Sequence, residues 1–558
     1  MVFNSACSSR WFPFSLAVVF LGFPLARSAA ADQPQWGQAW SRNMISLEKG
    51  LPDSFDPKSG KNLKWTATLG TQTFSTPVIA GGRVYIGTNN EEPRDPSHHA
   101  DSGVLMCFDE KSGKFLWQLV VPKREDDPYC DWPKTGMSSP VTVEGDHVYL
   151  VSNRGEVMCL DARGMANGND GPFKEEAAHM VPRILGGEAT RATNSSANRS
   201  LPTPAPGKIE TSATDADILW LFDLTTGAGI WSHDGAHSSI LIDEDFLYLN
   251  TGTGVDNTHK VIRTPNAPSL IVLDKRTGRY LARDDEHMAP DIFHCTWSSP
   301  SMGKVGGRKL IFFAGGNGII YAFEPVDKNI LHAAPNSSPT RSAGLQPAWD
   351  RRARQSRLQT SAPTTLKKVW QFDFDPTAPK EDIHKYLSNR REGPSNFYGM
   401  PVFDHDRIFI AGGGDVFWGK NEAWLKCIDA TKTGDITTNG LVWSYPLEKH
   451  VLGTPAIFGD CVFIADNART MHCVNAKTGQ PNWTQEIQGE VWASPLAADG
   501  KVYLGARNGD FWIFEASKEK RVLGKIQLGA PINSTVTAAN GAIYFATMNQ
   551  LFAIRKSK

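Results

Sequence analysis

Short apolar stretches separated by turns recur along the chain, and apolar side chains alternate within them, as Val84 and Ile86 do. A period of two is typical of a β-strand. The stretches follow one order. A small-small-Pro step leads into an aromatic or β-branched stretch, then comes a stretch that ends in an acid before a Thr-Gly or Ser-Gly turn, and then one that carries Trp. The pattern predicts a repeated unit of four short strands joined by turns.

Eight such units can be counted. Their first strands begin near Ser75, Ser138, Ser238, Ser298, Gly399, Gly453, Ala493 and Asn533. The last unit ends at 551–554 after only three strands, whereas a Trp-bearing stretch, 63–67, stands alone near the other end of the chain. A ring closed by its own N-terminal strand explains both observations and leaves no open sheet edge. We therefore predict an all-β fold, an eight-bladed β-propeller of four-stranded blades that the N-terminal strand closes.

Two recurring side chains give the unit a physical basis. The acid before the Thr-Gly turn can accept backbone N–H bonds, and the Gly supplies the positive φ that the turn needs. The Trp can pack over the neighbouring sheet, with its N–H reaching a turn carbonyl. Units three and seven carry Tyr280-Leu281 and Val522-Leu523 in the place of Trp. In unit two we expect Trp220 to fill this position.

The repeat resembles the pyrroloquinoline quinone (PQQ) repeat, whose core is Asp-x-x-Thr-Gly-x-x-x-Trp. The resemblance extends over nearly the whole mature chain. Segments 87–91, 105–111 and 427–434 are similar to secreted PQQ-like propellers common among planctomycete-type bacteria. More distantly, the chain is similar to quinoprotein dehydrogenases and to the outer-membrane-assembly propeller. The resemblance implies the propeller fold, and for activity it implies either PQQ-dependent oxidation or cofactor-free partner binding.

The N-terminus has the features of a secretory signal peptide, with Arg10, a short apolar run and the small residues 28–31. We therefore expect a signal peptide at 1–31 and a periplasmic or secreted protein. An N-terminal extension would occupy 32–62 and the propeller 63–558. Two insertions, 163–217 and 325–365, join third to fourth strands. No later stretch is apolar over the ~20 residues that a membrane span needs.

Composition and charge narrow the choice of partners. The length of 558 residues by itself favours three or four domains at ~150 residues each, but the repeat replaces this estimate with a single ring. The 58 Lys+Arg and 59 Asp+Glu residues give a formal net charge of -1. No global field then attracts nucleic acid or anionic lipid. We predict a local site at the channel mouth for an envelope protein or a small-molecule ligand.

The cysteines indicate packing rather than metal binding. One position of the repeat is shared by Cys107, Cys159, Cys427, Cys473, Ala322 and Val272. A position that Cys, Ala and Val share is a buried apolar one. The chain has no Cys-x-x-Cys and its histidines show no ligand spacing, so no metal site is predicted. Cys130 and Cys295 lie off the repeat pattern, but in non-neighbouring blades, which disfavours a disulfide.

The connections between blades, and those between second and third strands, open on one face, called the first face below. It carries the candidate chemistry. Under the resemblance, three Trp and three Arg residues would bind the cofactor: Trp132, Trp297, Trp492, Arg154, Arg469 and Arg507. Aromatic faces and cations suit a flat quinone with three carboxylates. A dehydrogenase would also need Ca²⁺ and a general base, for which Asp131, His237 and His294 are candidates.

Three classes of function stay open. A binding module is favoured, because the chain has neither the Cys-Cys pair on which many quinoprotein alcohol dehydrogenases stack the cofactor nor a Cys-x-x-Cys-His haem site. The alternative is a PQQ-dependent dehydrogenase that oxidises an alcohol or sugar, with PQQ and Ca²⁺ as cofactors. The third is a carbohydrate-active propeller. Its paired acids, Asp126-Asp127 and Asp284-Asp285, are predicted to be solvated turn residues.

Overall fold

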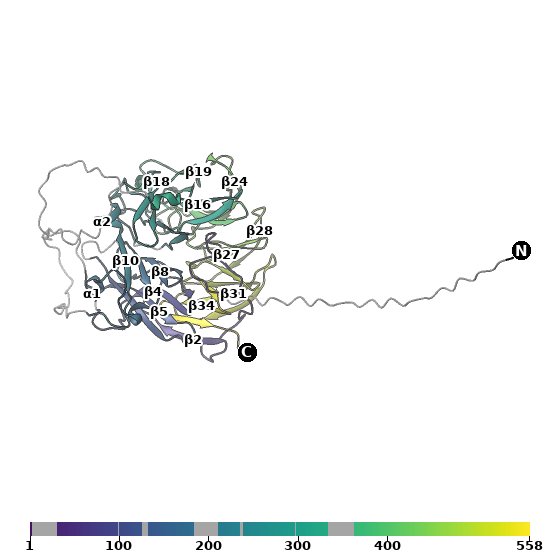
Figure 1. Ribbon diagram of the computed structural model, residues 1–558. Coiled ribbons are helices and arrows are strands. Elements are labelled where there is room, and N and C mark those ends of the chain that lie inside the picture. Colours follow the sequence, from purple (N-terminus) through teal and green to yellow (C-terminus); the bar gives the residue numbers. More distant parts are fainter. Residues whose placement is uncertain are drawn as a thin grey trace, which may run out of the picture.

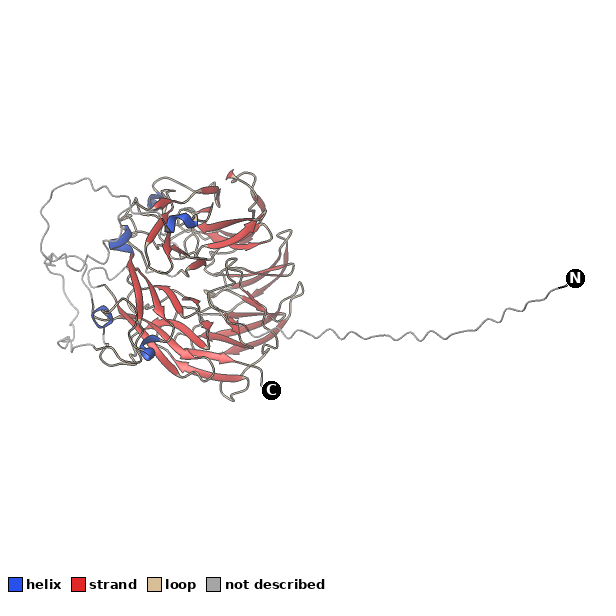
Figure 2. Ribbon diagram, viewed as in Figure 1, coloured by secondary structure: helices blue, strands red, loops and turns tan. Residues whose placement is uncertain are grey.

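Eight small sheets are arranged around a common axis in the computed structural model of the protein (Figures 1 and 2). The structure describes residues 1–2, 31–98, 100–124, 132–182, 210–234, 238–295, 297–332 and 362–557. Each sheet is a blade in which an inner, a second, a third and an outer strand pair in that order, and three blades gain a short fifth strand. The predicted all-β, eight-bladed propeller is confirmed.

The blades are numbered here by their order in the chain. The inner strands are β3 (Val78–Ala80), β7 (Thr142–Glu144), β11 (Leu241–Asp243), β15 (Ser301–Val305), β20 (Val402–Asp404), β25 (Ala456–Phe458), β29 (Leu496–Ala498) and β33 (Thr537–Ala539). The second strands are β4 (Arg83–Asn89), β8 (His147–Val151), β12 (Phe246–Asn250), β16 (Arg308–Ala314), β21 (Arg407–Gly413), β26 (Cys461–Asp466), β30 (Lys501–Gly505) and β34 (Ala542–Ala546). These two sets are short and mostly buried.

The third strands are β5 (Ser102–Asp109), β9 (Glu156–Asp161), β13 (Leu270–Asp274), β17 (Ile319–Phe323), β22 (Ala423–Asp429), β27 (Thr470–Asn475), β31 (Asp510–Glu515) and β35 (Gln550–Ile554). The outer strands are β6 (Phe115–Pro122), β10 (Ile218–Asp223), β14 (Tyr280–Arg283), β19 (Lys368–Asp373), β24 (Leu441–Leu447), β28 (Pro481–Glu486), β32 (Val522–Gln527) and β2 (Leu63–Thr68). The additional strands are β1 (Ile45–Ser46), β18 (Thr364–Thr365) and β23 (Gly434–Asp435).

Helices in the described residues are few and short (Figure 2). They are α1 (Glu176–His179), α2 (Leu224–Ala228) and the 3₁₀ helices Gly164–Asn167, Ala289–Asp291, Lys328–Leu331 and Ile383–Tyr386. None of those in the described part of the chain has the length and apolar character of a transmembrane helix. The long connections from β9 to β10 and from β17 to β19 contain the two expected insertions, of which 183–209 and 333–361 lie outside the described residues.

The ring is closed by two strands from opposite ends of the chain. β2 pairs antiparallel with β35, and Trp65 lies opposite Ala553. Figure 1 shows this purple strand beside the yellow strands of blade 8. The N-terminal strand therefore supplies the outer strand that the last unit lacks, as the sequence predicts.

Adjacent blades are joined by tryptophans on the outer strands. Each indole N–H donates to a backbone carbonyl of the next blade at 2.9–3.2 Å. The pairs are Trp65–Glu110, Trp117–Ala162, Trp220–Lys275, Trp370–Ala430, Trp443–Ala476 and Trp483–Ser517. Trp220 holds this position in blade 2, as expected. The recurring cysteines Cys107, Cys159, Cys427 and Cys473 are buried free thiols, as their exchange with Ala and Val predicts.

The N-terminal extension winds once around the axis inside the ring. Residues 33–46, called the inner collar below, form hydrogen bonds with the inner strands of all eight blades in chain order. Along the ring, the bonding residues on those strands are Ile79, Val143, Ile242, Met302, Phe403, Ile457, Ala497 and Ala538. The collar thus provides partners for backbone groups at the inner edges of the sheets.

Arg42 belongs to the collar and is fully buried. Its guanidinium donates to the carbonyls of Trp36, Ser239 and Pro300 at 3.0–3.1 Å, so it links the collar to blades 3 and 4. Burial lowers the pKa of Arg42 to about 9, which leaves the side chain charged at pH 7. A guanidinium with several donors in one plane can bond several carbonyls at once.

Truncating Arg42 should destabilise the whole ring. Arg42→Ala leaves three buried carbonyls without their donor, and each such loss costs ~1–3 kcal/mol. We expect the free energy of unfolding, measured from urea titrations, to fall by at least about 3 kcal/mol. The control is Arg308→Ala, which removes an exposed Arg paired with Glu324 and should cost no more than ~1 kcal/mol. Equal losses in the two variants would refute the structural role of Arg42.

The blade 8 to blade 1 junction can be tested through one turn glycine. Gly113 has φ +71°, and a Cβ atom there would lie 2.6 Å from the Trp65 ring, whereas Gly434 has φ +79° and open space at the same position. Gly434→Ala should lower the free energy of unfolding by only ~1–2 kcal/mol, the cost of a left-handed backbone conformation for a residue with a Cβ atom. Gly113→Ala should lower the free energy of unfolding by a further ~1–3 kcal/mol, because the new methyl group displaces Trp65. Thermal unfolding followed by Trp fluorescence compares the two, and indistinguishable midpoints would contradict this docking.

Candidate ligand cavity and histidine cluster

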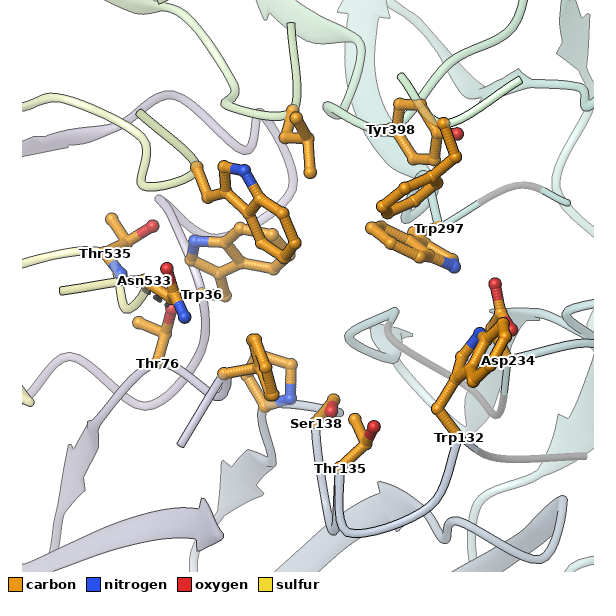
Figure 3. A pocket seen from close by; sticks show the side chains of 15 residues that line it. Trp36, Thr76, Trp132, Thr135, Ser138, Asp234, Trp297, Tyr398, Asn533 and Thr535 are labelled. Carbon is orange, nitrogen blue, oxygen red and sulfur yellow. Dashed lines mark hydrogen bonds between the residues drawn. The ribbon is translucent and has the colours of Figure 1, made fainter. Parts of the chain in front are cut away.

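A cavity of about 280 Å³ opens on the first face, close to the axis (Figure 3). Seven aromatic side chains line it: Trp36, Phe74, Trp132, Trp297, Tyr398, Phe417 and Trp492. The other lining residues are Thr76, Thr135, Ser138, Pro140, Asp234, Leu452, Asn533 and Thr535. The cavity is therefore mostly aromatic, with a small number of polar groups, which is the usual character of a small-molecule site.

The connections between blades position this lining. Trp132 follows blade 1, Asp234 follows blade 2, Trp297 follows blade 3 and Trp492 follows blade 6. Figure 3 shows Trp132, Asp234 and Trp297 on one side of the cavity, facing Trp36 of the inner collar. The sequence placed Trp132, Trp297 and Trp492 on the first face, and the structure brings all three to one cavity.

Several polar groups of the cavity lack a hydrogen-bond partner among the described residues. The indole N–H groups of Trp36 and Trp492, the Ser138 hydroxyl and the Asn533 carbonyl are buried and have no hydrogen-bond partner among the described residues. Buried polar groups are normally paired, and an unpaired one calls for an explanation such as a ligand or water. Asp234 is the single charged residue among the described lining residues.

A second, more polar pocket of about 530 Å³ lies behind Phe417 and Trp492, which line both spaces. It contains Arg390, Lys449 and the predicted residue Arg507. The Arg507 guanidinium lies 4.0 Å from the centre of the Trp492 ring and 3.1 Å from the Glu490 carboxylate. Arg507 therefore supports Trp492 from the side away from the aromatic cavity.

Three histidines converge beside Asp234. His233, His259 and His294, called the histidine cluster below, have ring centres 4.9–5.1 Å apart. The Nε2 atoms of His233 and His294 are 3.1 Å from each other. The Asp234 carboxylate lies 3.4 Å from each of these two Nε2 atoms. His259 comes from the β12–β13 loop, whereas the other two come from connections between blades.

Asp415 anchors the cluster from behind. It is fully buried in the loop between β21 and β22, and its Oδ2 lies 2.9 Å from His294 Nδ1. The Tyr398 hydroxyl donates a short bond to the same oxygen, and Oδ1 accepts the backbone N–H groups of Phe417 and Trp418 at 2.9 and 2.7 Å. One carboxylate thus fixes a histidine of the cluster and two aromatic residues of the cavity, Tyr398 and Phe417.

Burial and these contacts set the charges of the cluster. Burial would raise the pKa of Asp415, but His294, Tyr398 and the backbone hold it below its usual range. Burial would lower the pKa of His294, but Cys295 and Asp415 raise it well above the usual value. Burial raises the pKa of the Cys295 thiol to about 12, so at pH 7 Asp415 is the anion that acts on His294. Burial and the neighbouring His294 lower the pKa values of His233 and His259.

Other predicted site residues lie apart from the cavity. Arg154 is buried in blade 2, where it pairs with Glu156 at 3.3 Å. Arg469 is an exposed turn residue with φ +70°. Asp131 and His237 lie outside the described residues. Asp284, predicted to be solvated, is instead buried, and its carboxylate accepts hydrogen bonds from the N–H groups of Ser269 and Leu270 at 2.7 Å.

The sequence analysis missed several residues that form the site. It named His294 as a candidate base but did not relate it to the other residues of the site, which are His233, Asp234, His259, Tyr398 and Asp415. His233 and Asp234 lie next to Trp231, in the same connection between blades as the candidate His237. Their position in a first-face connection was the available signal. Their convergence with His259 depends on how neighbouring loops pack, which spacing along the chain does not reveal.

Comparisons with known proteins agree with the repeat. A family model described as outer membrane protein assembly factor BamB matches residues 100–239 and 421–522. No curated protein sequence matches the chain. Among solved structures, a europium-containing methanol dehydrogenase aligns with a TM-score of 0.52 and 11% identity over 94% of this chain and 98% of that chain. BamB from Moraxella catarrhalis gives 0.44 and 10%, over 88% and 97%. At 11% identity the methanol dehydrogenase shows a shared fold alone, and residues 100–239 and 421–522 are similar to the BamB family model.

The cavity does not fit the PQQ cofactor that this type of repeat implies. Three carboxylates need cations or several N–H donors. Among the described residues that line the cavity none is Lys or Arg, and its charged residue is the acid Asp234. The expected arginines Arg154 and Arg507 are engaged with Glu156 and Glu490. We therefore derive no chemical step through PQQ.

The anchoring role of Asp415 predicts a measurable contribution from Tyr398. Tyr398→Phe removes the hydroxyl that donates to a buried carboxylate, a bond worth ~1.5–3 kcal/mol. We expect the free energy of unfolding in urea to fall by this amount. Tyr386→Phe, a change on a partly exposed tyrosine, should stay within ~0.5 kcal/mol of the unmodified protein. A neutral Tyr398→Phe would contradict the anchoring role.

Proposed function

We propose that the protein is a ligand-binding module whose first-face cavity holds a small uncharged molecule with an apolar ring face and hydroxyl groups, such as a monosaccharide. The observation that carries this proposal is the composition of the cavity. Its wall is aromatic, its unpaired polar groups are neutral, and its charged residue is one acid. Such a site recognises shape and hydrogen bonds rather than net charge.

The aromatic wall supplies most of the binding energy in this proposal. Burying apolar surface contributes ~25 cal/mol per Å², and flat indole rings match the C–H face of a six-membered ring. Trp297 is held at 4.7 Å from the Tyr398 ring, centre to centre, and Trp492 stacks on Phe74. These contacts fix the rings in advance, which lowers the entropic cost of binding.

The polar groups of the cavity supply specificity. The Trp36 and Trp492 N–H groups can donate, the Asn533 carbonyl can accept, and the Ser138 hydroxyl can do both. Hydroxyl groups on a ligand match all of them, whereas an anionic ligand would face Asp234. The volume of about 280 Å³ suits a molecule of about one ring. A site built to bond a hydroxyl rejects analogues that lack it.

The features of the N-terminus support, in our proposal, a location outside the cytoplasm. Arg10, the apolar run and the small residues 28–31 have the pattern that secretion machinery recognises. In the periplasm or outside the cell a propeller of this kind would meet free sugars and cell-envelope glycans, and the cavity would select among their terminal rings.

Calorimetric titration with a panel of neutral monosaccharides tests the proposal. At least one should bind with a 1:1 stoichiometry and quench Trp fluorescence, and the matching sugar acid should bind ~10-fold or more weakly because its carboxylate meets Asp234. PQQ with Ca²⁺ serves as the competing ligand. Retention of PQQ, or failure of every neutral ring in the panel to bind, would overturn the proposal.

Trp132 provides a matched pair of variants. It lines the cavity and is 44% exposed, so its replacement should leave the core intact. Trp132→Ala should weaken binding by ~5–30-fold, in line with a stacking contact of ~1–2 kcal/mol. Trp132→Phe keeps an aromatic face and should lose less than half of that energy. Equal binding by both variants would place the ligand elsewhere.

A further inference from the structure

The histidine cluster has the geometry of a metal site. The ligand atoms of His233, His259 and His294 all lie within 4.8 Å of one another. In a tetrahedral site with metal–nitrogen bonds of ~2.0–2.1 Å, two ligand nitrogens are roughly 3.3 Å apart. The observed 3.1 Å between the Nε2 atoms of His233 and His294 is close to that spacing. The His259 Nε2 is also buried and has no hydrogen-bond partner among the described residues.

The contacts of the second ring nitrogens of these histidines also support a metal site. Ligating histidines usually donate their second ring N–H to a carboxylate or a backbone carbonyl, which turns the other nitrogen toward the metal. His294 has such a contact between Nδ1 and Asp415 at 2.9 Å. His233 has one with the backbone of Val255. The two Nε2 atoms, 3.1 Å apart, then lie where one metal ion can bind both in place of a proton shared between the rings.

We infer that His233, His259 and His294 hold a divalent transition-metal ion such as Zn²⁺, with the Asp234 carboxylate as a fourth ligand on the cavity side. Imidazole nitrogen is a preferred ligand of Zn²⁺, Cu²⁺ and Ni²⁺, whereas Ca²⁺ and Mg²⁺ prefer oxygen. Asp234 both adjoins the two Nε2 atoms at 3.4 Å and lines the cavity. The ion would therefore form part of the boundary of the aromatic cavity.

An ion at this position would contribute to the structure of the cavity wall. Phe417 lies 5.9 Å from His294 and 6.2 Å from Trp297, centre to centre, and Trp418 lies 5.0 Å from His259. An ion that fixes the three imidazole rings would also fix the loop that carries Phe417 and Trp418, and Phe417 lines the cavity. Metal binding is measured without the proposed ligand, and the comparison of neutral sugar with sugar acid applies to chelator-treated protein, in which the Asp234 carboxylate binds no metal ion.

Metal content and affinity of the full mature protein test the inference. After dialysis against a chelator, Zn²⁺ should rebind at one ion per chain, and Co²⁺ should give the intense visible bands of a tetrahedral site. Zn²⁺ should also raise the unfolding midpoint, as any ligand specific to the folded state does. X-ray absorption at the zinc edge should show imidazole scattering from three ligands. Binding without an imidazole signature would overturn the site.

Two variants and a control locate the ion. His259→Gln removes a ligand that is only half-buried, so the fold should persist while Zn²⁺ affinity falls by more than ~100-fold. Asp415→Asn leaves the ligands in place but loosens His294, and should cost ~10–100-fold. His450→Gln changes a buried histidine of the second pocket and should leave affinity unchanged. Unchanged affinity in His259→Gln, or a wild-type protein that retains no Zn²⁺ because a proton alone joins the rings, would refute the inference.

Discussion

The inner edges of eight sheets impose the constraint on which the rest of this structure depends. Each inner strand has one side paired within its blade and one side turned to the axis, where unpaired backbone groups are costly. The inner collar meets this demand by bonding to all eight inner strands in chain order. A stretch of this length, 33–46, reaches at most roughly 46–50 Å, which suits one turn around a narrow channel. The fully buried Arg42 then joins collar and blades through three carbonyls.

The candidate site is built upon this closed centre. Trp36 of the collar lines the cavity on one side, while connections between blades supply Trp132, Asp234 and Trp297 on the other. Asp415 then ties the cavity to the histidine cluster, because it binds His294, Tyr398 and the backbone of the 417–418 loop. A rigid ring with adaptable loops on one face is a common way to place a binding site.

The propeller could be predicted from the sequence because its signals are local and repeated. The spacing of the Thr-Gly turns and of the Trp residues shows the blades, and the isolated Trp65 strand shows how the ring closes. The same reasoning placed Trp132, Trp297 and Trp492 on the first face, and these three residues line one cavity. It did not predict that Arg154 is buried against Glu156, because this contact depends on packing within blade 2. It also did not predict the collar, because residues 33–46 contain no repeated sequence pattern. His233 and His259 meet only through tertiary contacts between loops.

Closure of the ring by the N-terminal segments affects the order in which the protein can fold during translation. The collar and β2 leave the ribosome long before their partners Ala538 and Ala553. The collar and β2 must therefore wait, without their final contacts, until these partners have been made. Folds dominated by such distant contacts form slowly. A chain truncated before β33 would lose three strands of blade 8 and leave β2 without its partner, so the result would be an open propeller rather than a slightly smaller one.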